Sequence, residues 1–156
     1  MEIEIRRAEN HDIPRIIELL SQVLEVHAAG RPDLFKSGTT KYSEEELAGI
    51  IADNERPIFV GEHGGVVQGY AFCIFQRHND RNTPDFTTLY IDDLCVDEKS
   101  RGNHIGRSMY EYVLKFAKEQ GCYNVTLNVW TCNESAMKFY EKCGLSVQKY
   151  GMEKIL

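Results

Sequence analysis

The chain lacks any apolar run long enough to span a membrane, and its first ten residues, "MEIEIRRAEN", hold no apolar stretch typical of a signal peptide. We therefore expect a cytoplasmic protein with no membrane partner. The chain also lacks a basic tail or a cluster of Lys and Arg. Its 18 basic residues stand against 24 acidic ones, for a formal net charge of −6. This balance argues against a nucleic-acid partner and weakly favours a cationic one, such as an amine.

Paired cysteines are missing as well. The five cysteines are odd in number, and no Cys-x-x-Cys or Cys/His pair has the spacing of a zinc site. Most lie in apolar or helical stretches, which is typical of buried thiols in a reducing compartment. We expect no metal. With only four prolines and no linker or low-complexity segment, residues 1–156 are predicted to form a single domain, as a monomer or a homodimer.

The hydrophobic pattern alternates between strand and helix periods along the chain. It predicts the order β-α-α-β-β-β-α-β-α-β, a mixed α/β sheet with helices on both faces. Strands are expected at 2–6, 58–62, 66–77, 86–96 and 124–130, with one or two more in 145–156. Helices are expected from Ile13 to His27, from a Ser43 cap to about 54, from the loop near 104 to about 120, and from an Asn133 cap to a stop at Gly144.

A glycine-broken turn, "SRGNHIGRS" at 100–108, runs directly into the third helix. Such a turn offers unpaired backbone N–H groups and the positive end of a helix dipole, which suit phosphate. Arg101 and Arg107 add charges able to bind phosphate in a bidentate manner. A plain chain reversal would use the same glycines, so the turn alone leaves both readings open. The pattern fits neither a P-loop nor a dinucleotide-binding fingerprint.

The strand before this turn changes parity. Leu89 and Ile91 share one face, whereas Leu94 and Val96 share the other, with the pair Asp92–Asp93 at the change. Because side chains alternate across a strand, this slip predicts a β-bulge, although Tyr90 and Cys95 can be read as apolar on the opposite parity. A bulge frees backbone groups and can part the strand from its neighbour.

These features in this order resemble the GNAT superfamily of acetyl-CoA-dependent N-acetyltransferases. The family's Arg/Gln-x-x-Gly-x-Gly/Ala loop is matched at Arg101–Gly106 in all but one place, and "NESAMKFYEKCGL" is similar to the family's second motif, with Leu145 for Phe. The resemblance implies a centrally splayed sheet of six to seven strands flanked by about four helices. It implies acetyl-CoA as cosubstrate, no metal, and a primary amine acceptor.

The resemblance also assigns roles. Backbone amides of the turn would hold the pyrophosphate, the main chain of Leu94–Val96 would pair with the pantetheine arm, Asn133 would steady that arm and Tyr140 would protonate the leaving thiolate. The cofactor residues expected are Leu94, Cys95, Val96, Arg101, Gly102, Asn103, His104, Ile105, Gly106, Arg107, Ser108, Asn133 and Tyr140. The alternative is that Asn133 is only a helix N-cap and that Tyr140 is only a core side chain. His104 replaces a family glycine, and a negative φ there, as in a first helical turn, would leave the site intact.

An alkyl ammonium titrates near ~10, so the amine needs a base before it can attack a carbonyl. Asp92 is the first candidate, by similarity to polyamine acetyltransferases, and Asp93 or water is the second; both aspartates can equally be solvated strand-end charges. A role for Cys95 as a nucleophile that carries the acetyl group is less favoured, because nothing near Cys95 lowers the pKa of its thiol. For the acceptor side, His27, Phe35 and Tyr42 are candidates, although His27 also reads as a core-edge histidine.

The acceptor itself stays open among a small amine, an amino-acid derivative, an aminoglycoside and a protein N-terminus, with a small or polyamine-like amine slightly favoured. Two other classes of function remain. One is a non-catalytic domain that binds or senses acyl-CoA through the same loop. The other is an unrelated nucleotide-phosphate binder, which would need a lysine or metal ligands that the loop lacks.

Overall fold

The computed structural model describes residues 2–156. The elements are β1 (Glu4–Arg7), α1 (Ile13–Gly30), α2 (Glu44–Ile51), β2 (Ile58–His63), β3 (Val66–His78), β4 (Phe86–Val96), α3 (Ile105–Glu119), β5 (Asn124–Leu127) and α4 (Glu134–Lys142), with short 3₁₀ turns at Asn10–Asp12 and Glu98–Ser100. Within these residues, no helix is both long and apolar enough to cross a bilayer.

The five strands form one mixed sheet in the order β1-β2-β3-β4-β5. Strands β1 to β4 pair antiparallel, and β5 pairs parallel to β4. The glycines of the β2–β3 turn, Gly64 and Gly65, have φ of 58° and 79°, which explains why this hairpin needs glycine. The predicted mixed α/β fold is confirmed, with five strands rather than six or seven.

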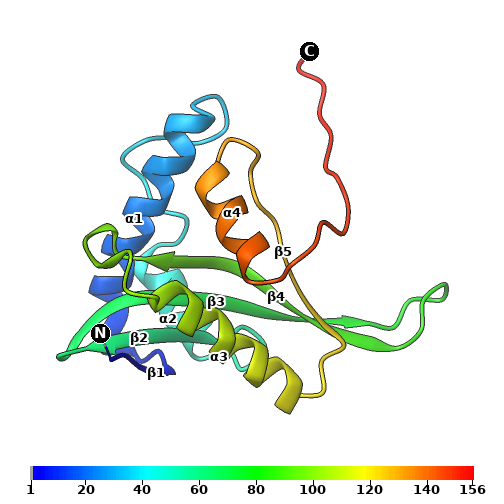
Figure 1. Ribbon diagram of the computed structural model, residues 1–156, viewed down its shortest axis with the longest axis horizontal. Coiled ribbons are helices and arrows are strands. Elements are labelled where there is room, and N and C mark those ends of the chain that lie inside the picture. Colours follow the sequence, from blue (N-terminus) through cyan, green and yellow to red (C-terminus); the bar gives the residue numbers. More distant parts are fainter. Residues whose placement is uncertain (1) are drawn as a thin grey trace.

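Helices cover both faces of the sheet, as Figure 1 shows. On one face, α1 and α2 pack apolar side chains such as Leu20 and Leu47 against Val60 and Phe72. On the other face, Met109 and Val113 of α3 belong to a second core with strand residues that include Leu89. Ser43 caps α2 as predicted, because its side chain accepts a hydrogen bond from the Glu46 amide and the Glu46 side chain reaches back.

The predicted bulge is present in β4. Asp93 lies opposite Phe72 and Ile91 lies opposite Cys73, so Asp92 has no partner residue on β3. Strand β5 pairs with β4 only as far as Ile91. Beyond the bulge, β4 therefore continues with a free edge on the β5 side, and the sheet is splayed at its centre.

Two sequence predictions about strands are wrong. The strand expected at 124–130 ends at Leu127, because β4 diverges there and leaves the following residues without a partner. The one or two strands expected in 145–156 do not form within this chain, where the segment has no regular structure and leaves the body of the molecule (Figure 1). Gly144, with φ of 95°, does end α4 as expected.

Candidate active site

The turn before α3 presents a row of free backbone amides. Within residues 2–156, the six N–H groups from Gly102 to Arg107 have no protein acceptor, whereas the Ser108 amide donates to the His104 carbonyl at 3.0 Å. The row therefore ends one residue earlier than the resemblance implies, and Ser108 is left with only its hydroxyl for that role. Unpaired amides at a helix start form an anion site.

His104 takes the backbone conformation that glycine would take. Its φ is 60° and its ψ is 17°, in the left-handed region, so the negative φ under which the site would stay intact with a histidine is not present. Histidine is among the residues that tolerate this region, at a cost of roughly 1–2 kcal/mol. Gly102 is also left-handed, at φ of 87°, and left-handed residues in a turn are a feature of anion nests.

The turn is held from both ends. Asp97, at the end of β4, forms an ion pair with Arg15 of α1 and accepts a hydrogen bond from the Lys99 amide at 3.0 Å. Burial raises the pKa of Asp97, but the hydrogen bond from the Lys99 amide and the charge of Arg15 lower it. The net pKa lies below its ordinary value, so Asp97 stays charged. On the other side, Gly106 lies so close to Phe139 of α4 that an added Cβ would sit 3.2 Å from the ring.

The splay leaves the second half of β4 open to a ligand. Leu94, Cys95 and Val96 pair with β3 on one side, and no strand among residues 2–156 pairs with them on the other. Gly69 lets β3 approach closely here, because an added Cβ would sit 2.7 Å from the Cys95 carbonyl oxygen. An extended arm with amide groups can complete such an edge.

The two aspartates at the bulge lie in different surroundings. Asp92 is already engaged, since Oδ1 accepts from the Lys41 ammonium at 2.9 Å and Oδ2 accepts from the Tyr42 hydroxyl at 2.6 Å. Asp93 accepts from the buried Tyr70 hydroxyl at 2.7 Å. Burial raises the pKa of Asp93 to about 6, while the Tyr70 hydrogen bond works against the rise. A carboxylate with such a pKa is suited to accept protons near neutral pH.

Tyr140 lies two turns along α4 from Asn133, whose side-chain oxygen caps the helix by accepting from the Ala136 amide at 3.3 Å. Burial raises the pKa of Tyr140 above its ordinary value, and the negative charge of Asp93 adds to the rise. Tyr140 stays protonated at neutral pH and can donate a hydrogen bond.

The three acceptor-side candidates fall into two groups. His27 lies 4.9 Å from Phe35, and Phe35 lies 5.4 Å from Trp130, between ring centroids. Tyr42 stacks on Phe72 and reaches Asp92. Burial lowers the pKa of His27, with a smaller contribution from the charge of Lys41. His27 is therefore mostly neutral at pH 7, at the edge of an aromatic surface.

Sequence reasoning missed three of these residues. Trp130 lies beyond the end of β5, Tyr70 is fully buried on β3, and Lys41 lies in the loop before α2. None belongs to a motif, and each comes to the site only through strand register or loop path. The single tryptophan of the chain was the one signal available.

Cys95 does not have the surroundings of a nucleophile. Burial raises the pKa of its thiol to about 12, and its Sγ lies 3.8 Å from the Leu19 carbonyl oxygen. Among residues 2–156, no group of three or more His, Cys, Asp or Glu side chains is placed to hold a metal ion.

The splayed mixed sheet, the row of free amides at the start of α3 and the free edge of β4 together match the architecture of acyl-CoA-dependent transferases. The profile of the Acetyltransferase (GNAT) family matches residues 20–145. The chain belongs to this family of acetyltransferases.

Several relatives of the chain are named as N-acetyltransferases. The chain is 34% identical to a probable glucosamine 6-phosphate N-acetyltransferase 2 from Oryza sativa, over 91% of this chain and 81% of the relative. It is 37% identical to glucosamine 6-phosphate N-acetyltransferase from Arabidopsis thaliana, over only 42% of each chain. It is 26% identical to thialysine N-epsilon-acetyltransferase from Bos taurus, over 91% of this chain and 83% of the relative.

Among solved structures, a mutant of the BH1408 protein from Bacillus halodurans superposes with a TM-score of 0.94. It is 28% identical, and the match covers 98% of this chain and 99% of that one.

Proposed function

We propose that this protein transfers an acetyl group from acetyl-CoA to a small primary amine by direct attack. The observation that carries the proposal is the row of six free amides, Gly102 to Arg107, next to a strand edge that no other strand occupies. When bound, acetyl-CoA supplies a thioester carbonyl as electrophile. The amides of the turn hold its pyrophosphate, and Arg101 adds charge from the exposed side of the turn. The main chain of Leu94–Val96 hydrogen-bonds the pantetheine arm.

Asp93 is the base in this proposal, ahead of Asp92. A base needs a free oxygen and a pKa near the working pH. Both oxygens of Asp92 already accept hydrogen bonds, from Lys41 and Tyr42. Asp93 has one oxygen bonded to Tyr70 and a pKa of about 6. Asp92 and its partners then serve to hold the acceptor.

The proton and bond changes balance within these residues. The amine nitrogen forms a bond to the acetyl carbon, and the carbon–sulfur bond breaks. Asp93 takes the proton that the ammonium form of the acceptor loses before it attacks, and the second proton, lost as the amide forms, passes to the departing thiolate. Tyr140 donates a hydrogen bond to the departing thiolate, whose ordinary thiol pKa is about 8.5, and Asn133 orients the arm that carries it.

The acceptor is proposed to be a small amine that carries other polar groups. The aromatic surface of His27, Phe35 and Trp130 can cover an apolar portion of it. The cations of Lys41 and Arg56, which lie 5.6 and 5.8 Å from the Tyr42 ring centre, favour an anionic group on the same acceptor. The names of the relatives point to two such amines, a phosphorylated amino sugar and a lysine analogue.

The experiment is a comparison of acceptors. Thiol release from acetyl-CoA is followed with glucosamine 6-phosphate, glucosamine, thialysine, spermidine and a short peptide with a free N-terminus. We expect one of the small amines to be at least about tenfold better in kcat/KM than the peptide, a difference of about 1.4 kcal/mol. A clear preference for the peptide would replace the small-molecule acceptor with a protein N-terminus.

A further inference from the structure

Lys41, in the loop between α1 and α2, supplies an internal cation to the acceptor side of the molecule. Its ammonium lies 2.9 Å from Oδ1 of Asp92, the residue that the bulge in β4 leaves without a partner on β3. Among residues 2–156, Lys41 is the only lysine that forms an ion pair. The Asp92 side chain is 12% exposed and the Lys41 side chain is 46% exposed. An ammonium that arrives from solvent therefore meets a carboxylate that is already neutralised.

The charge of Lys41 also acts on two other groups of the acceptor side. Burial raises the pKa of Asp93 to about 6, and the Tyr70 hydrogen bond and then the charge of Lys41 work against that rise. Burial lowers the pKa of His27, and the charge of Lys41 lowers it further. Lys41 thus contributes to the electrostatics of the proposed base and to those of the aromatic edge.

Two cations and one carboxylate surround Tyr42. The Tyr42 hydroxyl donates a hydrogen bond to Asp92 at 2.6 Å. The Lys41 ammonium and the Arg56 guanidinium lie 5.6 and 5.8 Å from the centre of the Tyr42 ring. This cluster carries an excess of positive charge, which attracts an anionic group and repels a second ammonium. Without Lys41, the remaining cation and carboxylate would balance, and Asp92 would lose its counter-ion.

We propose that Lys41 determines acceptor specificity, an inference that rests on the acetyl transfer proposed above. Its ammonium holds the place on Asp92 that the second ammonium of a diamine would take. The protein therefore favours an amine whose far end is anionic or neutral over a diamine or polyamine. The acidic pair at the bulge would by itself suit a polyamine, and Lys41 is the repulsive element that excludes one.

The test compares three four-carbon amines that differ only at the far end. Butylamine ends in a methyl group, 4-aminobutanoate in a carboxylate and 1,4-diaminobutane in a second ammonium. Their binding to the full chain is measured by calorimetry in the presence of coenzyme A, which carries no acetyl group to transfer. We expect the wild type to bind the diamine most weakly of the three.

Two variants of Lys41 separate its charge from its bulk. Lys41→Met is neutral and has a side chain of similar length, so it should raise the affinity for the diamine, relative to that for the carboxylate, at least about tenfold. Lys41→Arg keeps a cation that can pair with Asp92 and should keep the wild-type order of affinities. Circular dichroism checks that both variants fold.

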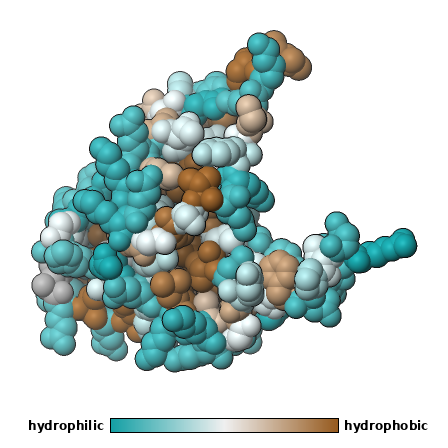
Figure 2. Space-filling view, turned by 45° about the vertical axis from the view of Figure 1, so that its right-hand side comes forward, coloured by the Kyte–Doolittle hydropathy of each residue, from teal (hydrophilic) through white to brown (hydrophobic). Residues whose placement is uncertain are grey.

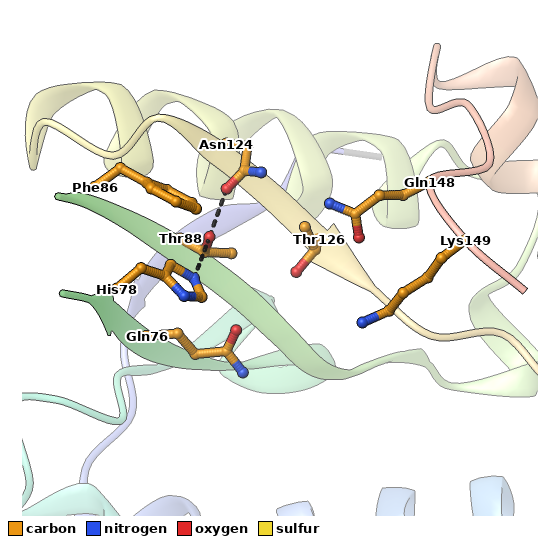
Figure 3. Close-up of a pocket in the computed structure, with 8 residues that line it drawn as sticks. All are labelled: Gln76, His78, Phe86, Thr88, Asn124, Thr126, Gln148 and Lys149. Atoms are coloured by element: carbon orange, nitrogen blue, oxygen red, sulfur yellow. Dashed lines mark hydrogen bonds between the residues drawn. The ribbon is translucent and has the colours of Figure 1, made fainter. Parts of the chain in front are cut away.

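Lys149 provides the matched control. It belongs to the C-terminal segment 145–156, which Figure 2 shows projecting from the body beside a hollow with an apolar floor. Its side chain lines a small hollow with Thr126 and Asn124 of β5 (Figure 3). Lys149→Met removes the same charge as Lys41→Met but frees no carboxylate, so it should leave the order of the three amines unchanged.

A double variant separates the release of Asp92 from a general loss of positive charge. In Lys41→Met/Asp92→Asn the carboxylate is gone, so the gain in affinity for the diamine should disappear. The same ratio of affinities in the wild type and in Lys41→Met overturns the proposal, as does a gain that persists in the double variant. Acetyl transfer is measured separately. The expected change in binding without any transfer would overturn the proposed function and leave the selectivity for amines in place.

Discussion

At the scale of single residues, two adjacent aspartates have opposite surroundings. Asp92 lies at the bulge with both oxygens hydrogen-bonded, and Asp93 lies against the buried Tyr70 with a pKa raised by burial to about 6. Sequence reasoning could name the pair and rank it by resemblance, but it could not see the partners of each aspartate, which come from loops and strands far along the chain. Its order, Asp92 before Asp93, stays a prediction, and the contacts favour the reverse.

The pH dependence of turnover tests this order. Asp93 must be deprotonated to accept the proton of the amine, so kcat/KM of the wild type should fall about tenfold per pH unit below a pKa near 6. Asp93→Asn should lower kcat by about 10²- to 10⁴-fold and abolish this limb. Asp92→Asn should keep the limb and mainly raise the KM of the amine. A limb that disappears only in Asp92→Asn would restore Asp92 as the base.

Two phenylalanine variants test the same carboxylate, because each removes a tyrosine hydroxyl that hydrogen-bonds to one of the two aspartates. The Tyr70 hydroxyl stabilises the charged form of Asp93, so Tyr70→Phe should move the acid limb to higher pH. Tyr42→Phe removes the equivalent hydroxyl from Asp92 and should leave the limb in place. Equal shifts in the two variants would show that the limb does not report Asp93.

Tyr140 is tested by removal of its hydroxyl alone. Tyr140→Phe keeps the ring against Phe139, 5.1 Å away between centroids. We expect kcat to fall by about 10²- to 10⁴-fold with little change in the affinity for coenzyme A or in the thermal midpoint. Normal turnover on the preferred amine would leave the hydroxyl a structural role only.

At the scale of elements, the turn into α3 depends on two residues with positive φ, Gly102 and His104. The sequence indicates the amide row through its glycine pattern, but not the conformation of His104. That conformation follows from the anchors on either side, Asp97 with Arg15 and Gly106 against Phe139. The bulge in β4 could be predicted, because a change of parity is a local signal within one strand.

An isosteric pair at Gly102 tests the anion site. A Cβ at Gly102 meets nothing within 4 Å, and its φ of 87° is a strain that Asn and Asp share. Gly102→Asp adds a negative charge beside the amide row, and Gly102→Asn has the same shape without the charge. By calorimetry, Gly102→Asp should bind coenzyme A at least about tenfold more weakly than Gly102→Asn. Equal affinities would place the pyrophosphate elsewhere.

At the scale of the whole molecule, the sequence predicted which segments can be strands but not where each finds a partner. Residues 124–130 and 145–156 both alternate like strands. The first loses its partner after Leu127, where β4 turns away at the splay, and the second has no partner within the chain. Strand pairing is a long-range property, so alternation of side chains cannot settle it. The same splay that ends β5 opens the edge at Leu94–Val96.

The most direct test of the account is the stoichiometry of acetyl transfer by the full chain. The protein is incubated with acetyl-CoA that carries an isotopic label in the acetyl group, together with the preferred amine, and thiol and product are measured in the same sample. The account predicts one labelled amide for each thiol released, no release without amine, and loss of both in Asp93→Asn/Tyr140→Phe. Tight binding of acetyl-CoA without thiol release, across every amine tried, would contradict it and leave a domain that only binds or senses acyl-CoA.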